Sequence, residues 1–402
     1  MKIAVISSGF FPVIDGVSVA VYNRLRILSQ TGHQVLLFCP DYSALEQTYP
    51  DWKNYTGDIF PNVNVVTLPS QPALGLAFER DVRPQAYDLV AEKLQSFQPD
   101  LIQIDEPERL FVCFRKLPGV QFAKQYQIPC ISFFHTNYIE YVEDYLPAPK
   151  IIIACINFFL KQLFSWIYNA YDVTLVSSPV TYEKITQMGI CNGKYEKFLG
   201  VDLEQFDTNN RHQNFFQQEY GFSGVDNKVK LLFVGRLTPD KGWDFTYKVF
   251  EKLHQVIDLN SLAVIVVGDG PLHAQIFQEL SQYININFTG RISPSRMPAL
   301  FVNSDIYVTH SEKETTGLTV LEACAARIPV IAPQAGGVVD NIKEGWNGFI
   351  YNPQDVDDFI SKLETLVKDS FLREKMGENG RDYVNDFTWE RVVKNTINLG
   401  ID

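Results

Sequence analysis

The sequence predicts an α/β protein built from two Rossmann-like domains that face each other across a deep interdomain cleft. Its 402 residues exceed the roughly 250–300 residues that a single hydrophobic core usually organises. Strand-like apolar runs alternate with segments of helical apolar spacing, which indicates open parallel sheets covered by helices. This alternation restarts after about residue 200, so we expect two such sheets.

The first half of the chain opens on a buried-strand pattern. Its apolar run is short and is followed by Pro12 and polar residues, so we interpret it as a strand and not as a signal peptide. Strands are predicted at 2–7, 33–39, 64–68, 99–104, 129–134 and 173–176, and helices at 17–31 and 86–97.

The second half repeats the pattern. Strands are predicted at 228–234, 263–267, 284–289, 305–309 and 329–332, and helices at 243–256, 274–282 and 320–326. We expect an acceptor-side domain at 1–200, a nucleotide-binding domain at 201–380, and a last helix within 381–402 that crosses back to the first domain. Ligands bind at the carboxyl ends of strands in such folds, so strand-end residues are the ones to consider.

Composition excludes several function classes. The net charge of −12 and the pI near 5.1 disfavour a nucleic-acid partner, although a local basic pocket for a diphosphate stays compatible with them. The six cysteines form no CxxC pair, which predicts no zinc site, no disulfide framework and a reducing, cytoplasmic compartment.

His135 directly follows the predicted strand at 129–134. A histidine there can bind a sugar hydroxyl or stabilise developing charge. The alternative is a core histidine bonded to a backbone carbonyl. His310 also ends a strand and is a second candidate.

The loop at 7–17 places Gly16 at the start of a helix. Free N–H groups at a helix start bind anions, although a tight turn that needs glycine for its geometry explains the residue as well. The loop lacks GxGxxG, which argues against a nicotinamide- or flavin-dependent oxidoreductase.

Arg236 and Lys241 follow the apolar strand at 228–234. Two fixed cations there would stabilise a leaving diphosphate without a metal. The alternative is a pair of solvated surface charges.

Glu314 and Glu322 stand eight residues apart, with Thr316, Gly317 and Leu318 between them. The helix start in this stretch offers backbone N–H groups to a phosphate. Glu314 would then hold a sugar and Glu322 a ribose, because carboxylates accept hydrogen bonds from vicinal hydroxyls. In the alternative interpretation, Glu314 or Glu312 only caps a helix and Glu322 is a solvated helical residue. The apolar neighbours of Glu322, Leu321 and Ala323, disfavour the solvated role.

An ordered set of motifs resembles the retaining glycosyltransferases of family 4. The motifs are PVIDGV (12–17), TGHQV (31–35), FFHT (133–136), LVSSP (175–179), GVDLEQF (200–206), GRLTPDKG (235–242), GDGP (268–271), FTGRI (288–292), ETTGLTVLEA (314–323) and PVIAPQAGG (329–337). The resemblance implies the GT-B fold and spans nearly the whole chain.

The resemblance also implies residue roles. Arg236 and Lys241 form the diphosphate clamp, Glu314 and Glu322 are the paired glutamates, and His135 is the strand-end histidine. Together His135, Glu314, Arg236 and Lys241 are the predicted catalytic residues. The predicted donor-binding set is Gly16, Arg236, Lys241, Arg291, Glu314, Thr316, Gly317, Leu318 and Glu322.

Family members use a nucleotide-sugar, here preferentially a UDP-sugar, with neither metal nor cofactor. Their favoured mechanism is front-face substitution. Asp15 stands where the family usually has a second glycine, so only Gly16 carries over at that loop.

The segment FFHTNYIEYVEDYL and the apolar stretch 150–171 resemble family members that glycosylate lipids. We therefore expect a lipid or other membrane-associated acceptor, an acceptor pocket at Tyr138 and Tyr141, and peripheral membrane contact. A helix buried on several sides is the alternative for 150–171. The apolar run 151–160 is expected to be too short to span a bilayer.

Three other functions stay open at this stage. A GT-B epimerase or hydrolase would need an additional acid/base pair, and product analysis with donor alone would reveal it. A catalytically silent subunit would bind donor without turnover. An oxidoreductase rests on fold analogy alone.

Overall fold

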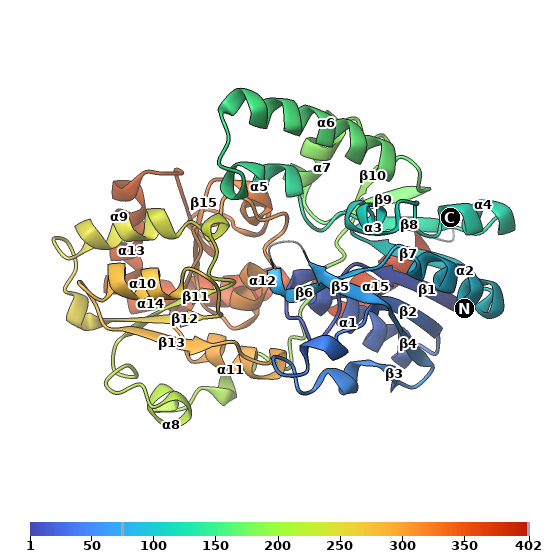
Figure 1. The fold of residues 1–402 in the computed structure, drawn as a ribbon. Coiled ribbons are helices and arrows are strands. Elements are labelled where there is room, and N and C mark those ends of the chain that lie inside the picture. Colours follow the sequence, from blue (N-terminus) through green and yellow to red (C-terminus); the bar gives the residue numbers. More distant parts are fainter. Residues whose placement is uncertain (74–75, 400–402) are drawn as a thin grey trace. The chain divides into compact units, whose positions relative to one another are not determined.

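The computed structural model describes residues 1–73 and 76–399 and divides the chain into two compact units (Figure 1). Unit 1 comprises Met1–Gly200 and Trp389–Asp402, and unit 2 comprises Val201–Thr388. The chain therefore returns to unit 1 at Trp389 and not at residue 381. The intervening helix α14 (Ser370–Val384) packs on α12 (Leu318–Ala325) of unit 2, which keeps it in that unit.

Unit 1 contains an eight-stranded sheet in the order β10-β9-β8-β7-β1-β2-β4-β3. Neighbouring strands are parallel except for the β3–β4 pair at one edge. The strands are β1 (Lys2–Ser7), β2 (Gln34–Pro40), β3 (Gly57–Phe60), β4 (Val63–Leu68), β7 (Leu101–Asp105), β8 (Cys130–Phe133), β9 (Val173–Val176) and β10 (Gly193–Tyr195).

Helices cover this sheet, and the last of them comes from the end of the chain. They are α1 (Gly16–Gln30), α2 (Ala86–Phe97), α3 (Pro107–Phe114), α4 (Val120–Tyr126), α5 (Tyr138–Tyr145), α6 (Lys150–Tyr168), α7 (Pro179–Gln187) and α15 (Trp389–Asn398). Helix α15 packs against α1. A separate hairpin, β5 (Ser70–Ala73) and β6 (Leu76–Val82), is held by ion pairs of Arg109 with Glu79 and Asp81.

Unit 2 contains a six-stranded parallel sheet in the order β13-β12-β11-β14-β15-β16. In chain order this is the 3-2-1-4-5-6 arrangement of a Rossmann sheet. The strands are β11 (Val229–Val234), β12 (Leu262–Val267), β13 (Ile286–Gly290), β14 (Ile306–Val308), β15 (Val330–Pro333) and β16 (Gly348–Tyr351). Besides α12 and α14, its helices are α8 (Phe215–Tyr220), α9 (Trp243–Leu253), α10 (His273–Leu280), α11 (Met297–Val302) and α13 (Val356–Lys368).

Helix α6 differs from both sequence expectations. It continues through Asn157 and Lys161 for 19 residues, and its most apolar window of 18 residues has a mean hydropathy of 1.6. By length and composition alone it could cross a membrane, so the expectation that this segment is too short was wrong. The alternative of a helix buried on several sides is also wrong, because only 22% of its most apolar window is buried within the protein. Ile153, Phe164, Ile167 and Tyr168 are buried, but one side of the helix is exposed: Ile151 by 74%, Phe158 by 59%, Phe159 by 70% and Trp166 by 55%.

Candidate functional site

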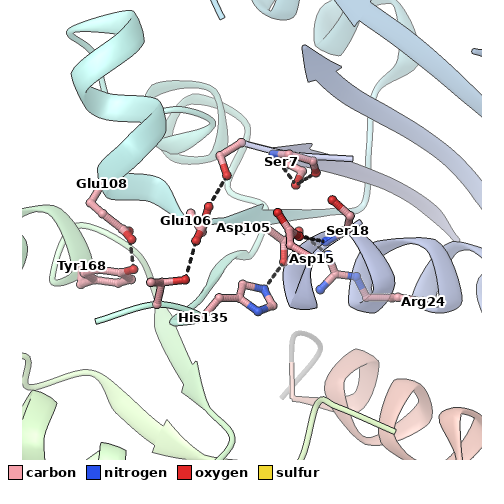
Figure 2. Close-up of polar contacts among 12 residues, drawn as sticks. Ser7, Asp15, Ser18, Arg24, Asp105, Glu106, Glu108, His135 and Tyr168 are labelled. Carbon is pink, nitrogen blue, oxygen red and sulfur yellow. Dashed lines mark hydrogen bonds and ion pairs between the residues drawn. The ribbon is translucent and has the colours of Figure 1, made fainter. Parts of the chain in front are cut away.

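His135 follows β8 and is bonded to the end of the neighbouring strand β7. Its Nε2 lies 2.7 Å from Oδ1 of Asp105 (Figure 2). Both side chains are buried. The alternative interpretation of His135 is a core histidine bonded to a backbone carbonyl. The partner of Nε2 is instead the Asp105 carboxylate, so that interpretation does not describe this contact.

Asp105 is also ion-paired with Arg24 of α1 (Figure 2). Burial alone would raise the pKa of Asp105, but the Arg24 guanidinium and the His135 hydrogen bond hold that pKa below its ordinary value. Arg24 in turn stacks over the Phe133 ring, 4.2 Å from its centroid. Asp105 is therefore an anion fixed by a cation on one side and an imidazole on the other.

Glu106, the next residue, accepts hydrogen bonds from three hydroxyl groups. They come from Ser8 after β1, from Thr136 at 2.8 Å and from Tyr138 at 2.9 Å. Glu106 is buried and has a positive φ of 53°. The hydroxyl of Tyr138, a predicted acceptor-side residue, is thus bonded inside the protein. Tyr141 lies partly buried on α5.

Glu108 lies on the first turn of α3 and accepts a hydrogen bond from Tyr168 of α6 (Figure 2). Burial, followed by the neighbouring Glu106, raises its pKa to about 8. Glu106 and Glu108 together tie α5 and α6 to the end of β7. No sequence motif selects Asp105 or Glu106, although both lie at the end of a buried strand as His135 does.

The β1–α1 loop is shaped by Asp15. Its carboxylate caps α1 by accepting a hydrogen bond of 2.7 Å from the Ser18 N–H. The Ser18 N–H, one of the free backbone N–H groups expected at this helix start, is therefore bonded to a side chain of the protein. A Cβ added at Gly16 would meet nothing within 4 Å, so no packing constraint requires glycine there.

This open space makes Gly16→Ala a test of the predicted phosphate contact. We expect the variant to keep or slightly raise its melting temperature, since alanine favours a helix over glycine by up to about 1 kcal/mol. We expect the KM for the nucleotide-sugar to rise about tenfold, because a methyl group would hold a phosphate off the backbone. An unchanged KM would remove Gly16 from the donor site.

In unit 2 the two glycine motifs after β11 and β12 are packed backbone to backbone. The Gly235 N–H donates to the Val267 carbonyl at 3.0 Å, and the Leu237 N–H donates to that of Asp269 at 3.0 Å. A Cβ at Gly268 would lie 2.0 Å from the Gly235 carbonyl oxygen. This close approach fixes the loop that carries Arg236.

Lys241 and Glu314, predicted from separate motifs, are brought together. Lys241 Nζ lies 2.5 Å from Glu314 Oε1 and 3.6 Å from Asp240 Oδ2. The Lys241 and Glu314 side chains are partly exposed, whereas that of Asp240 is buried. A cation suited to a diphosphate and a carboxylate suited to a sugar thus meet in unit 2.

The backbone of the Glu314 loop is held by the glycines after β15. The Gly337 N–H donates to the Glu314 carbonyl at 2.6 Å, and a Cβ at Gly336 would lie 2.6 Å from the same oxygen. Gly317 has a φ of 80° and caps α12, whose first residue is Leu318. The Thr316 carbonyl accepts a hydrogen bond of 2.7 Å from the Asn341 side chain.

Glu322 lies one turn into α12. Its side chain is partly buried, which disagrees with a fully solvated helical residue, and burial raises its pKa to about 8. His310 is a core residue: its Nδ1 lies 2.8 Å from the Tyr351 hydroxyl, it contacts the Phe245 and Phe359 rings, and burial lowers its pKa to about 3. This environment removes His310 from the candidate site.

Arg291 follows β13 and forms an ion pair of 3.7 Å with Asp269 of the GDGP loop. Both side chains are exposed. Across residues 1–73 and 76–399 no group of three or more His, Cys, Asp or Glu side chains is placed to hold a metal ion.

Two family models match the chain, one in each unit. Residues 14–197 match the model described as Glycosyltransferase Family 4. Residues 217–383 match the model described as Glycosyl transferases group 1. Together the two matches cover the strands of both sheets except β1.

Named relatives match over nearly the full chain. The chain is 27% identical to sulfoquinovosyl transferase SQD2 of Arabidopsis thaliana, over 94% of this chain and 69% of the relative. It is 26% identical to a GDP-mannose-dependent alpha-mannosyltransferase of Corynebacterium glutamicum, over 97% and 86%. It is 24% identical to alpha-monoglucosyldiacylglycerol synthase of Streptococcus pneumoniae, over 99% and 87%.

The fold matches solved structures as well. The crystal structure of Anabaena HepE in complex with UDP-glucose superimposes with a TM-score of 0.71, covering 99% of this chain and 100% of that one at 18% identity. At this identity the likeness concerns the fold alone, which agrees with the two Rossmann-like units described above.

Proposed function

Because the chain belongs to the group 1 glycosyltransferases of family 4, which use sugar-nucleotide donors, we propose that it transfers a hexose-type sugar from a UDP-sugar to a lipid with retention of configuration. The observation that carries the donor half is the contact of 2.5 Å between Lys241 and Glu314. The GT-B fold, with its two Rossmann-like units, is the scaffold for this chemistry.

In the proposed donor site, Arg236 and Lys241 bind the diphosphate, and backbone N–H groups at the start of α12 assist them. Glu314 binds the sugar and Glu322 the ribose hydroxyls. Uridine is proposed as the base because UDP-sugars are common donors in the family that the sequence motifs resemble. The mannosyltransferase relative, named as GDP-mannose-dependent, makes guanosine the alternative for the test below.

In the proposed reaction the bond from the anomeric carbon to the diphosphate oxygen breaks while the acceptor hydroxyl attacks the same face. The leaving phosphate takes the proton of that hydroxyl. The electron pair of the broken bond stays on the diphosphate, where Arg236 and Lys241 stabilise the added charge. His135 is assigned to a hydroxyl of the transferred sugar.

Glu322 makes donor binding dependent on pH. Its pKa near 8 means that the empty site holds it protonated below about pH 8, whereas ribose hydroxyls donate best to the carboxylate. Binding then releases a proton, so affinity rises with pH up to about 8. Titration calorimetry with UDP-glucose should give a Kd roughly 50-fold weaker near pH 6 than near pH 8, because about half of the Glu322 side chains are ionised at pH 8 and about one in a hundred at pH 6. Glu322→Gln should flatten that profile, and an equally steep profile in the variant would contradict the assignment.

The exposed apolar face of α6 supports a lipid acceptor. Its side chains Ile151, Phe158, Phe159 and Trp166 are each more than half exposed, an arrangement typical of a helix that lies in a membrane interface. One relative is named alpha-monoglucosyldiacylglycerol synthase. We therefore propose diacylglycerol as the acceptor class, with the enzyme held at the inner face of a membrane.

Replacing both Phe158 and Phe159 with glutamate should abolish vesicle binding without unfolding the protein, because both side chains are exposed. In flotation with vesicles of phosphatidylglycerol and phosphatidylcholine, we expect the floated fraction to fall at least about tenfold. Phe371→Glu is the matched control, since Phe371 is 74% exposed in unit 2. Equal flotation of the double variant would place the membrane contact elsewhere.

The proposed function is tested in two steps. A thermal-shift screen of UDP, GDP and their sugars identifies the base, because a ligand specific to the folded state raises the melting temperature. UDP-sugars are then incubated with dioleoylglycerol vesicles, and the product is analysed by NMR for an α-linked glycolipid. A β-linked product or free sugar alone would contradict retaining transfer to a lipid.

A further inference from the structure

The contacts of His135 point to a residue that no motif selected. Asp105 ends β7, the strand beside the one that His135 follows. Its two carboxylate oxygens have separate partners, His135 on Oδ1 and Arg24 on Oδ2. All three side chains are at most 6% exposed. Figure 2 shows the imidazole pointing at the Asp105 carboxylate, with Arg24 reaching it from α1.

An anion that is buried this deeply is costly unless it is paired. Arg24 and His135 do more than neutralise the Asp105 charge, because each of them is bonded to a different carboxylate oxygen and so has a fixed position relative to the carboxylate. The 2.7 Å contact to Nε2 requires that this nitrogen carry a proton while Asp105 is ionised. Arg24, stacked on Phe133, in turn fixes the carboxylate. The orientation of the His135 ring and its proton is therefore set from α1 through Asp105.

We propose that Asp105, held by Arg24, is the positioning residue for His135 and keeps the imidazole protonated at Nε2 in the orientation in which it meets the donor sugar. This inference rests on the proposed role of His135 in glycosyl transfer. Asp105 itself acts through the histidine and touches no substrate. Other ionisable groups nearby have their own partners: Glu106 is bonded to hydroxyls of Ser8, Thr136 and Tyr138.

The first test is a double-mutant cycle with Asp105→Asn, His135→Ala and their combination, measured as transfer of labelled glucose from UDP-glucose to dioleoylglycerol vesicles. We expect Asp105→Asn to lower kcat about 10- to 100-fold. The KM for UDP-glucose should change less than about threefold, because the residues assigned to the diphosphate and the ribose lie in unit 2. In the His135→Ala background Asp105→Asn should cause no further loss. Losses that multiply, or a full-activity His135→Ala enzyme, would overturn the proposal.

Asp105→Asn leaves Arg24 buried without its counter-charge, which can destabilise the protein. The second variant is therefore Arg24→Gln with Asp105→Asn, a neutral pair that leaves no buried charge unpaired. We expect it to retain the wild-type melting temperature within a few degrees and to show the same loss of kcat. A variant that melts normally and turns over normally would overturn the proposal.

The second measurement needs no substrate and so separates this proposal from the proposed function. Nitrogen-15 NMR of histidine-labelled protein reports which ring nitrogen carries the proton, and His135→Ala identifies the signal. We expect the Nε2-protonated form in the wild type and a shift toward the other tautomer in both Asp105 variants. A wild-type ring protonated at Nδ1 alone, or unchanged signals in the variants, would overturn the positioning role. Normal signals in an enzyme inactive with UDP-glucose would contradict only the proposed function.

Discussion

Lys241→Ala should lower kcat/KM for the nucleotide-sugar by about 100- to 1,000-fold, the usual cost of losing one group that stabilises developing charge. The variant removes the proposed cation at the leaving diphosphate. It also leaves Glu314 without the partner 2.5 Å away, so the carboxylate assigned to the sugar loses its orientation. Steady-state kinetics with the donor that the thermal-shift screen selects provides the measurement.

Two comparisons make the Lys241 result specific. Lys252→Ala removes a lysine from the surface pair with Asp357 in the same unit, and should leave turnover unchanged. Lys241→Arg keeps the charge in a bulkier shape and should recover part of the activity. If Lys241→Ala keeps near-normal turnover, the clamp assignment is wrong.

Gly268→Ala should have the largest effect on the folding of unit 2. A Cβ at this position would lie 2.0 Å from the Gly235 carbonyl oxygen, and the backbone φ of 129° is one that side-chain-bearing residues rarely adopt. Relief requires the two glycine loops to separate, at a cost of roughly 3 kcal/mol or more. We expect the melting temperature to fall by about 10 °C and donor turnover to be lost, since Arg236 follows Gly235 directly.

Gly290→Ala is the matched control for this substitution. Gly290 accepts the Gly268 N–H at 2.9 Å and has a φ of 70°, but a Cβ there would meet nothing within 4 Å. It therefore carries conformational strain without a clash, about 1 kcal/mol. If the two variants melted alike, the close approach of the loops would not be what makes glycine necessary at Gly268.

The sequence predicted the strongly apolar parallel strands well. The ranges 2–7 and 173–176 coincide with β1 and β9, and 86–97 coincides with α2. Strands buried on both faces are nearly continuous apolar runs, which makes them recognisable from local pattern. The short edge strands β3 and β10 and the β5–β6 hairpin lack such runs, and they were missed for that reason.

Residues of the candidate site could be predicted from the sequence where each one lies in a recognisable local motif. Lys241 and Glu314 were selected from separate motifs, and their contact agrees with a shared site. Asp105 was missed, although it ends a strand as His135 does, because its significance depends on Arg24, 81 positions earlier. Pairing across that separation is a property of the folded sheet and of α1, and a local pattern does not contain it.

Helix α15 has a consequence for biosynthesis. Its buried apolar residues, Trp389, Val392, Val393 and Ile397, complete unit 1, yet the ribosome makes them after all of Val201–Thr388. At about 5–20 residues per second, that insertion takes on the order of ten to forty seconds to synthesise. During this interval the nascent first unit lacks the helix that packs on α1, and its uncovered apolar surface is a natural substrate for chaperones.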